Sequence, residues 1–234
     1  AQAHGASWQG RMVGSWGDAG AFSFCTDKIM STGGEGGMLL LQDEAAWRRA
    51  WAYKDHGKDW EAVYHGEHPP GFRWLHESFG SNWRMPEMQS AIGRVQLGKL
   101  ERWIGQRRRN AQVLTERFSG LPGLRVPRPP AEAAHAYYKL YVHVVPEALR
   151  SGWDRDAIVA AVGAKGVRCF HGGCSEIYLE RAFDGTGLRP RERLPVAREL
   201  GETSMMFQVD HTLSVDDMEW VAEAVEAVMR EAVR

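Results

Sequence analysis

One lysine stands in a setting that suits covalent chemistry. Lys28 follows Ser23, Thr26 and Asp27, and a glycine-rich run comes after it. A lysine that attacks an aldehyde must first lose its proton, so it needs a partly desolvated place near polarised groups. Nearby hydroxyls and backbone amides suit a phosphate, whose charge is best met by directed donors. A lysine in a polar loop is more often an ordinary surface residue, and these residues alone leave both interpretations open.

The glycine-rich run separates two expected strands. Residues 19–24 alternate small and aromatic side chains, residues 38–41 form a short apolar run, and both patterns predict strands. Glycines lose more backbone entropy in a helix than alanine does, so no stable helix is expected between the strands. The glycines concerned are Gly33, Gly34, Gly36 and Gly37. We therefore predict a loop whose backbone can approach another group closely.

Two helices are expected in the rest of the first half. Asp43 can cap a helix through about Tyr53, because its carboxylate accepts free amide hydrogens of the first turn. Apolar residues at helical spacing predict one long helix over residues 86–118, with Pro86 in its first turn. Between these helices, residues 54–81 lack periodicity and are rich in histidine and aromatic residues, which is typical of a functional or mobile loop. The HGEHPP segment of this loop lacks the i, i+4 spacing of a helical zinc motif, so no metal site is expected.

Prolines mark an expected domain boundary. The long helix ends near Gly120, and four prolines follow it: Pro122, Pro127, Pro129 and Pro130. We therefore assign residues 1–119 to a first domain and residues 120–234 to a second.

The second domain is expected to be a small α/β domain, because strand and helix patterns alternate along it. The predicted strands cover residues 137–145 and 167–170, and the predicted helices cover residues 154–162 and 214–230. Ser214 and Asp217 predict a capping box for the last helix.

The composition excludes several classes of protein. With 44% hydrophobic and 25% charged residues among 234, the chain can bury a core. A net charge of −1 gives no positive field for nucleic acid or an anionic membrane, and the arginines at 107–109 are expected on a solvated helix face. No apolar run approaches the roughly 20 residues of a membrane span. Cys25, Cys169 and Cys174 are spaced too irregularly for a disulfide framework or zinc, so a reducing, cytoplasmic setting is expected.

Three segments in order resemble one family of enzymes. The segment around Lys28 reads FSFCTDKIMSTGGEGGML; AQAHGASWQGRMVGSWGDAG precedes it and GSNWRMPEMQSAIGRVQLGKL follows it. Together they resemble the DegT/DnrJ/EryC1/StrS sugar aminotransferases, which are fold-type I enzymes that use pyridoxal 5'-phosphate (PLP). The resemblance spans essentially the whole chain. It implies an α/β fold, the C-terminal part of a fold-type I PLP-dependent transferase, with an incomplete large-domain sheet in residues 1–119 and a small C-terminal domain in residues 120–234.

The resemblance also implies roles for individual residues. Lys28 would form a Schiff base with PLP and then move a proton between the substrate Cα and the cofactor C4′, which is general acid–base work. Ser23 would contact the cofactor phosphate, and Gln2 would lie beside the pyridine ring. Asn82 would reach the phosphate in a neighbouring subunit, which implies a homodimer with shared active sites. Arg84 would either bind an anionic group of the substrate or form a structural ion pair.

The second domain offers weaker candidates for substrate contact. His171 and Tyr178 lie at a strand end and in the GGCSEIY segment, where a nucleotide-sugar could rest, as could Tyr137, Tyr138 and Ser175. Ordinary core or surface roles stay open for each of these residues.

The expected reaction is transfer of an amino group from an amino acid, by family analogy glutamate, to a nucleotide-linked keto-sugar, for polysaccharide or glycoconjugate biosynthesis. A sugar dehydratase is an alternative, but dehydrating members usually replace the lysine with histidine. A non-catalytic fragment or regulatory partner is a third interpretation. The family's aspartate partner of the pyridinium nitrogen belongs just before the AQ dipeptide, so we expect an N-terminal truncation and an inactive isolated chain.

Overall fold

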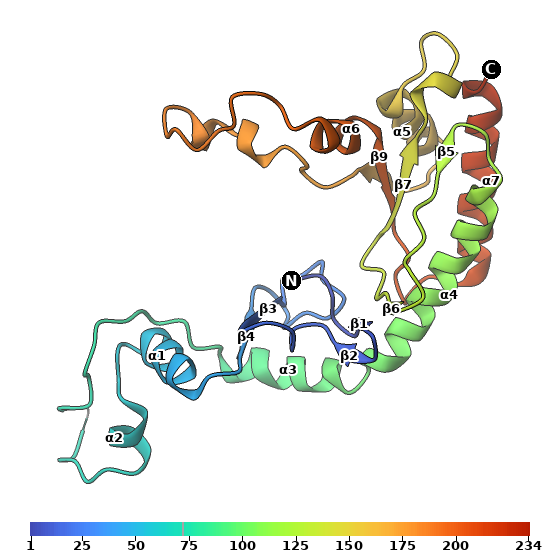
Figure 1. Ribbon diagram of the computed structural model, residues 1–234. Helices are drawn as coiled ribbons and strands as arrows, with labels where there is room; N and C mark the ends of the chain where they lie inside the picture. The colour runs from blue at the N-terminus through green and yellow to red at the C-terminus, as the bar shows by residue number, and fades with distance from the viewer. Residues whose placement is uncertain (72) are drawn as a thin grey trace. The chain divides into compact units, whose positions relative to one another are not determined.

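The chain folds into two compact units that mix helices and strands. The computed structural model describes residues 1–71 and 73–234. The first unit comprises Ala1–Glu101 with Glu132–His135, and the second comprises Arg102–Ala131 with Ala136–Arg234 (Figure 1). The predicted domain division at residue 120 differs from this one, because most of the helix that precedes residue 120 packs in the second unit.

Two small antiparallel sheets form the strands of the first unit. One has the order β2-β1-β6, made of β1 (Ser7–Trp8), β2 (Arg11–Met12) and β6 (Ala133–Ala134). The other pairs β3 (Ala19–Ser23) with β4 (Gly37–Leu41) and sets Ser23 opposite Gly37. The predicted strands around residues 19–24 and 38–41 are thus confirmed, and the glycine-rich loop joins them.

Aspartates begin the next two helices. Asp43 accepts a hydrogen bond from Ala46 N at 2.6 Å and caps α1 (Glu44–Lys54), as predicted. Asp59 caps α2 (Trp60–Tyr64) in the same way. This short helix lies inside the segment predicted as a loop, residues 54–81, of which Phe72 lies outside the described residues. Its Trp60 ring packs edge-on against two tryptophans of α1, which explains why so short a helix is held in place.

The predicted long helix is interrupted. The structure has α3 (Glu87–Leu97) and α4 (Leu100–Ser119), with Gly98 and Lys99 between them. Lys99 N donates to Gln96 O at 2.9 Å, so the bonding tightens locally from i→i−4 to i→i−3. The low helix preference of Gly98 favours an interruption at this point, although its own φ and ψ are those of a right-handed helix.

A four-stranded antiparallel sheet organises the second unit. Its order is β5-β7-β9-β8. The strands are β5 (Leu124–Arg125), β7 (Leu140–Val144), β8 (Cys169–His171) and β9 (Ser204–Phe207), and the helices are α5 (Arg155–Ala164), α6 (Pro195–Thr203) and α7 (Val215–Ala232). Three short 3-10 turns, η1 (Pro146–Ala148), η2 (Ile177–Leu179) and η3 (Arg181–Phe183), lie in the connections. Neither α6 nor β9 was expected from the sequence. For β9 the reason is that its segment SMMF lacks the β-branched residues that signal a strand.

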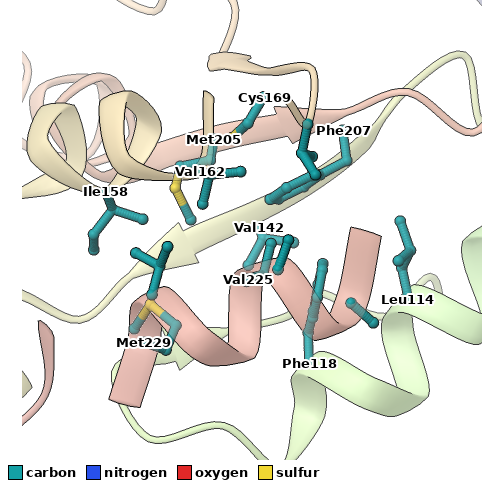
Figure 2. Packing of buried hydrophobic residues seen from close by; sticks show 14 of the residues in the cluster. Leu114, Phe118, Val142, Ile158, Val162, Cys169, Met205, Phe207, Val225 and Met229 are labelled. Carbon is teal, nitrogen blue, oxygen red and sulfur yellow. The ribbon is translucent and has the colours of Figure 1, made fainter. Parts of the chain in front are cut away.

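The main core of the second unit lies between this sheet and helices. Leu140, Val142 and Val144 alternate along β7 and are buried. Phe118 of α4 and Val225 of α7 pack in the same cluster, which Figure 2 shows around Val142. Since alternate residues of a strand face opposite sides, one side of β7 contributes to this core.

The expectation of a solvated arginine run is wrong for one residue. Arg107 is 1% exposed. Its guanidinium donates to Asp210 Oδ1 at 2.5 Å and to the carbonyls of Tyr137 and Tyr138. Arg107 therefore links α4 to Asp210 and to the Tyr137–Tyr138 backbone inside the second unit. Arg109 stays exposed.

Candidate functional site

Lys28 lies in the turn that follows β3. Its backbone N–H donates to Cys25 O at 3.0 Å, which closes the turn. The Lys28 side chain is 15% exposed, and its Nζ lies 3.1 Å from Asp27 Oδ1. The lysine is thus partly buried and already bound to a neighbouring acid, which the sequence motif did not reveal.

The loop around Lys28 is anchored by buried residues. Ile29, Met30 and Thr32 are each at most 5% exposed, although they sit in a glycine-rich segment. Phe24 N donates to Gly36 O at 2.7 Å and Thr32 N donates to Phe24 O at 3.2 Å. A Cβ on Gly36 would lie 2.5 Å from Thr32 Oγ1, so the close approach predicted for this backbone serves packing within the loop itself.

Two glutamines of α3 hold the same loop. Gln96 Oε1 accepts a hydrogen bond from Ser31 N at 2.8 Å. Gln89 Nε2 donates to Glu35 O at 2.6 Å. Neither glutamine is singled out by the sequence alone. Their spacing of i, i+7 puts them on one face of the helix, but α3 carries other polar residues as well, so this spacing is a weak signal.

Ser23 ends β3 on the approach to this turn. Its Oγ accepts a hydrogen bond from Cys25 N at 3.3 Å. A hydroxyl that accepts still has its own hydrogen to donate. Ser23 and Lys28 therefore belong to one loop, and Ser23 can offer a donor there.

Gln2 is exposed close to the beginning of the chain. Nearby His4 is 3% exposed, and its ring lies 5.1 Å from the ring of Phe22 and 5.9 Å from that of Phe24. Phe22 belongs to β3, so this contact ties the segment that carries Gln2 to the strand that leads to Lys28.

Asn82 and Arg84 lie together at the end of α1. Asn82 pairs with Asp55 in a backbone bridge. Arg84 Nε donates to Asn82 Oδ1 at 3.3 Å, and Arg84 Nη1 lies 3.5 Å from Asp55 Oδ1. The structure thus brings two predicted site residues into direct contact and places Asp55, which the sequence did not single out, beside both of them.

Asp55 is the centre of this cluster. It is 7% exposed, and Lys58 and Lys54 place their Nζ atoms 3.2 and 3.4 Å from its carboxylate. Burial opposes ionisation of Asp55, but the Lys58 hydrogen bond and the charges of Lys58, Lys54 and Arg84 outweigh it and hold the pKa of this carboxyl below its ordinary value. The carboxylate is therefore charged at neutral pH, with three cations around it.

His171 and Tyr178 lie in the second unit. His171 is on β8, 61% exposed, and its Nε2 is 3.2 Å from Asp156 Oδ1. The Tyr178 hydroxyl donates to Glu176 Oε1 at 2.7 Å and accepts from Leu194 N at 2.8 Å. The contacts described for these two side chains therefore link parts of the second unit to one another: His171 on β8 meets Asp156 on α5, and Tyr178 meets Glu176 and Leu194.

The Lys28 turn fits a cofactor that carries an aldehyde and a phosphate. A partly buried primary amine and a serine hydroxyl occur in one anchored loop. An amine can bind an aldehyde covalently, and a hydroxyl can donate to a phosphate oxygen. The two groups that such a cofactor needs, an amine for its aldehyde and a donor for its phosphate, therefore occur in this loop.

Among residues 1–71 and 73–234, no cluster of three or more His, Cys, Asp or Glu side chains could hold a metal ion. None of the helices described there is long and apolar enough to cross a bilayer. Cys25, Cys169 and Cys174 are free thiols.

Comparisons with known proteins agree on one family. The profile of the DegT/DnrJ/EryC1/StrS aminotransferase family matches residues 1–226. The X-ray structure of an aminotransferase from Psychrobacter cryohalolentis is similar to this chain, with 51% identity and a TM-score of 0.93, over 97% of this chain and 60% of that one.

Two curated relatives are also similar to this chain. The L-glutamine:2-deoxy-scyllo-inosose aminotransferase of Streptomyces kanamyceticus is 35% identical over 70% of this chain and 38% of its own length. The UDP-N-acetyl-3-dehydro-alpha-D-glucosamine 3-aminotransferase of Acidithiobacillus ferrooxidans is 33% identical over 71% of this chain and 40% of its own length. The chain spans less than two thirds of the length of each of these proteins.

Proposed function

This chain belongs to the DegT/DnrJ/EryC1/StrS aminotransferase family, and from that premise we propose that it is part of a PLP-dependent transaminase. The amino donor in this proposal is an amino acid, glutamate by family analogy, and the acceptor is a nucleotide-linked keto-sugar. The observation that carries the proposal is the Lys28 amine, partly buried in an anchored turn beside Asp27.

The residues of the turn have distinct tasks in this proposal. Lys28 Nζ binds the cofactor and then carries a proton to and from the amino-bearing carbon of the substrate. Ser23 donates to the cofactor phosphate, and Gln2 lies beside the cofactor ring. When bound, PLP supplies an electron sink for the bond that breaks at that carbon. Gln89 and Gln96 of α3 keep the loop in place through their bonds to Glu35 and Ser31.

A second subunit completes the proposed site. Asn82 reaches the phosphate bound by the partner copy, which makes the enzyme a homodimer with shared active sites. Arg84, His171 and Tyr178 are candidates for contact with the substrate. Residues 1–119 and 120–234 correspond in this proposal to the large and small domains of the family, and the location is cytoplasmic.

The nature of the acceptor is the finer part of the proposal. One relative is named for a UDP-linked sugar and the other for a cyclitol ketone. Assays with glutamate or glutamine as donor should therefore compare nucleotide-linked keto-sugars with a free cyclitol ketone. Turnover of the cyclitol alone would contradict the nucleotide-sugar proposal but leave transamination standing.

The cofactor proposal is tested by chemical trapping. We expect the protein, mixed with PLP, to develop a yellow absorbance that borohydride abolishes, and peptide mapping to place the reduced label on Lys28. Lys28→Ala should lose the label completely, because no other amine lies in this turn.

Lys165→Ala, which removes an exposed lysine beyond α5, is the matched control and should keep full labelling. A label on another lysine, or unchanged labelling of Lys28→Ala, would overturn the assignment of Lys28.

A further inference from the structure

We propose that Asp55, acting through Arg84, is a positioning residue that holds the side-chain amide of Asn82 with its NH2 group outward, as a donor for an anionic oxygen. The identity of that anion as the cofactor phosphate rests on the proposed function. The orientation of the amide does not, because it follows from contacts within the first unit.

The polarity of the Asn82 amide is set by its neighbour. Arg84 Nε lies 3.3 Å from Asn82 Oδ1. A guanidinium has five N–H donors and no acceptor, so the Asn82 atom that faces it must be the oxygen. Both hydrogens of Asn82 Nδ2 therefore point away from Arg84. Asn82 is exposed, so these donors can meet a ligand.

Asp55 holds the guanidinium of Arg84 in place. Arg84 Nη1 lies 3.5 Å from Asp55 Oδ1, and Asp55 is 7% exposed. Lys58 Nζ holds the same oxygen at 3.2 Å. The third guanidinium nitrogen of Arg84, Nη2, lies 3.3 Å from His56 Nε2. This ring nitrogen must be the acceptor, because the arginine can only donate. All three nitrogens of Arg84 thus have partners inside the cluster.

The backbone frame keeps the two segments in register. His56 N donates to Ser81 O at 3.0 Å, and Trp83 N donates to Lys54 O at 2.9 Å. Gly57 has a φ of +81°, and a Cβ there would lie 1.7 Å from Ser78 O. Only glycine allows this approach, so the turn after α1 brings Asp55 and Asn82 together through main-chain contacts. Within this backbone frame, the side-chain contacts from Asp55 to Arg84 and from Arg84 to Asn82 orient the Asn82 amide.

These contacts separate two roles for Arg84. If Arg84 bound a ligand directly, loss of Asp55 would free the guanidinium and would not weaken binding. If Arg84 positions Asn82, loss of either Asp55 or Arg84 releases the amide. The planar fork of arginine makes both contacts at once, which the single point charge of lysine does not.

The side-chain amide of Asn82 can be observed directly by NMR. Asn82 and Asn110 are the two asparagines of the sequence, so [15N]-asparagine labelling gives two side-chain NH2 signals. Asn110 is fully buried and donates to Asp210 O and Leu213 O, which makes it an internal reference. In the cofactor-free chain we expect Asp55→Asn and Arg84→Gln each to lower the side-chain {1H}–15N NOE of the Asn82 NH2 group toward that of a mobile amide, because the contact that holds its Oδ1 is lost. Arg84→Lys should restore little of this rigidity.

The matched control is Glu77→Gln, which removes one negative charge from the same exposed segment. It should leave both asparagine signals unchanged. An Asn82 NOE that is unchanged in Asp55→Asn and Arg84→Gln would overturn the proposal, whatever the chain binds. Loss of helical circular dichroism in Asp55→Asn would identify unfolding, in which case the exposed Arg84 variant decides the question.

A binding measurement then separates this inference from the proposed function. In a Lys28→Ala background, where the cofactor binds without a covalent bond, the Kd for PLP is compared with that for pyridoxal, which lacks the phosphate. We expect Asn82→Ala and Asp55→Asn to raise the Kd for PLP and to leave that for pyridoxal unchanged, with no further loss in the double variant. An effect of Asn82→Ala without one of Asp55→Asn would overturn the positioning role and leave the proposed function intact. No effect of Asn82→Ala on the Kd for PLP would remove the phosphate as the anion, while the NOE of the Asn82 amide would still judge its orientation.

Discussion

Glu176 holds together the segment between β8 and α6. Arg193 approaches its two carboxylate oxygens at 2.8 and 2.5 Å, and the Tyr178 hydroxyl donates to it at 2.7 Å. The Arg193 hydrogen bonds, followed by that of Tyr178, lower the pKa of Glu176 from 4.5 to about 2. A bidentate pair of this kind is among the stronger ionic contacts in proteins.

The lowered pKa of Glu176 makes the stability of this segment depend on pH. Because the folded pKa is lower than the unfolded one, the contact stabilises the segment above about pH 4.5 and loses this effect as pH falls through about 2. We expect residues 173–194 of Glu176→Gln to have lower hydrogen-exchange protection than the wild type at pH 7, and the two proteins to converge near pH 2. Glu192→Gln, an exposed acid of the same segment, should behave as the wild type at both pH values. Equal protection of Glu176→Gln and wild type at pH 7 would show that the ion pair does not hold the segment.

At the scale of elements, helix caps account for much of what local sequence can predict. Asp43 caps α1, Asp154 caps α5, and Ser214 with Asp217 forms the expected capping box of α7. The box has both of its bonds: Asp217 N donates to Ser214 Oγ at 3.1 Å, and Ser214 N donates to Asp217 Oδ2 at 2.7 Å. Each of these signals lies within four residues, so no knowledge of the fold is needed to read it.

The capping box of α7 gives a test of stability. Ser214→Ala leaves Asp217 N without its acceptor, and the free energy of unfolding should fall by about 1 kcal/mol. Ser151→Ala, in an exposed turn, is the control and should change it by less than about 0.5 kcal/mol. Urea unfolding followed by circular dichroism measures both. A Ser214→Ala midpoint equal to that of the control would mean that the cap does not limit the stability of α7.

A strand is also hard to predict from its own residues when it forms because of the segments that pack against it. β9 lies between β7 and β8 in the sheet, yet its sequence SMMF indicates no strand by itself. Two strands pair with it, and its Met205 and Phe207 are buried in the core. Strand preference follows such packing more than it follows the isolated backbone.

At the scale of the whole molecule, Arg107 joins distant parts of the second unit. It pairs with Asp210, 103 positions away, and donates to the carbonyls of Tyr137 and Tyr138. Arg117 makes a second connection, because it bridges α4 to Glu219 and Glu226 of α7, the two helices that lie side by side in Figure 1. The first of these contacts is buried and the second is partly exposed, so the first should matter more.

Removal of the buried cation should therefore be costly. Arg107→Met leaves the Asp210 carboxylate, 27% exposed, without its partner, and we expect a loss of about 3 kcal/mol in unfolding free energy. Arg109→Met, two positions along and exposed, should cost less than about 0.5 kcal/mol. Urea midpoints for the two variants decide the point, and similar midpoints would contradict a structural role for the buried pair.

The sequence by itself determined the local features of this protein. The strands around the glycine-rich loop, three helix caps and the Lys28 motif with its family resemblance are each carried by residues close together in the chain. Only the tertiary structure decided that Arg107 is buried, that Gln96 holds the Lys28 loop from 65 positions away, and that Asp55 meets Asn82 and Arg84. The physical reason is that burial and charge pairing depend on which segments the fold brings together, whereas caps and turns depend on the few residues that form them.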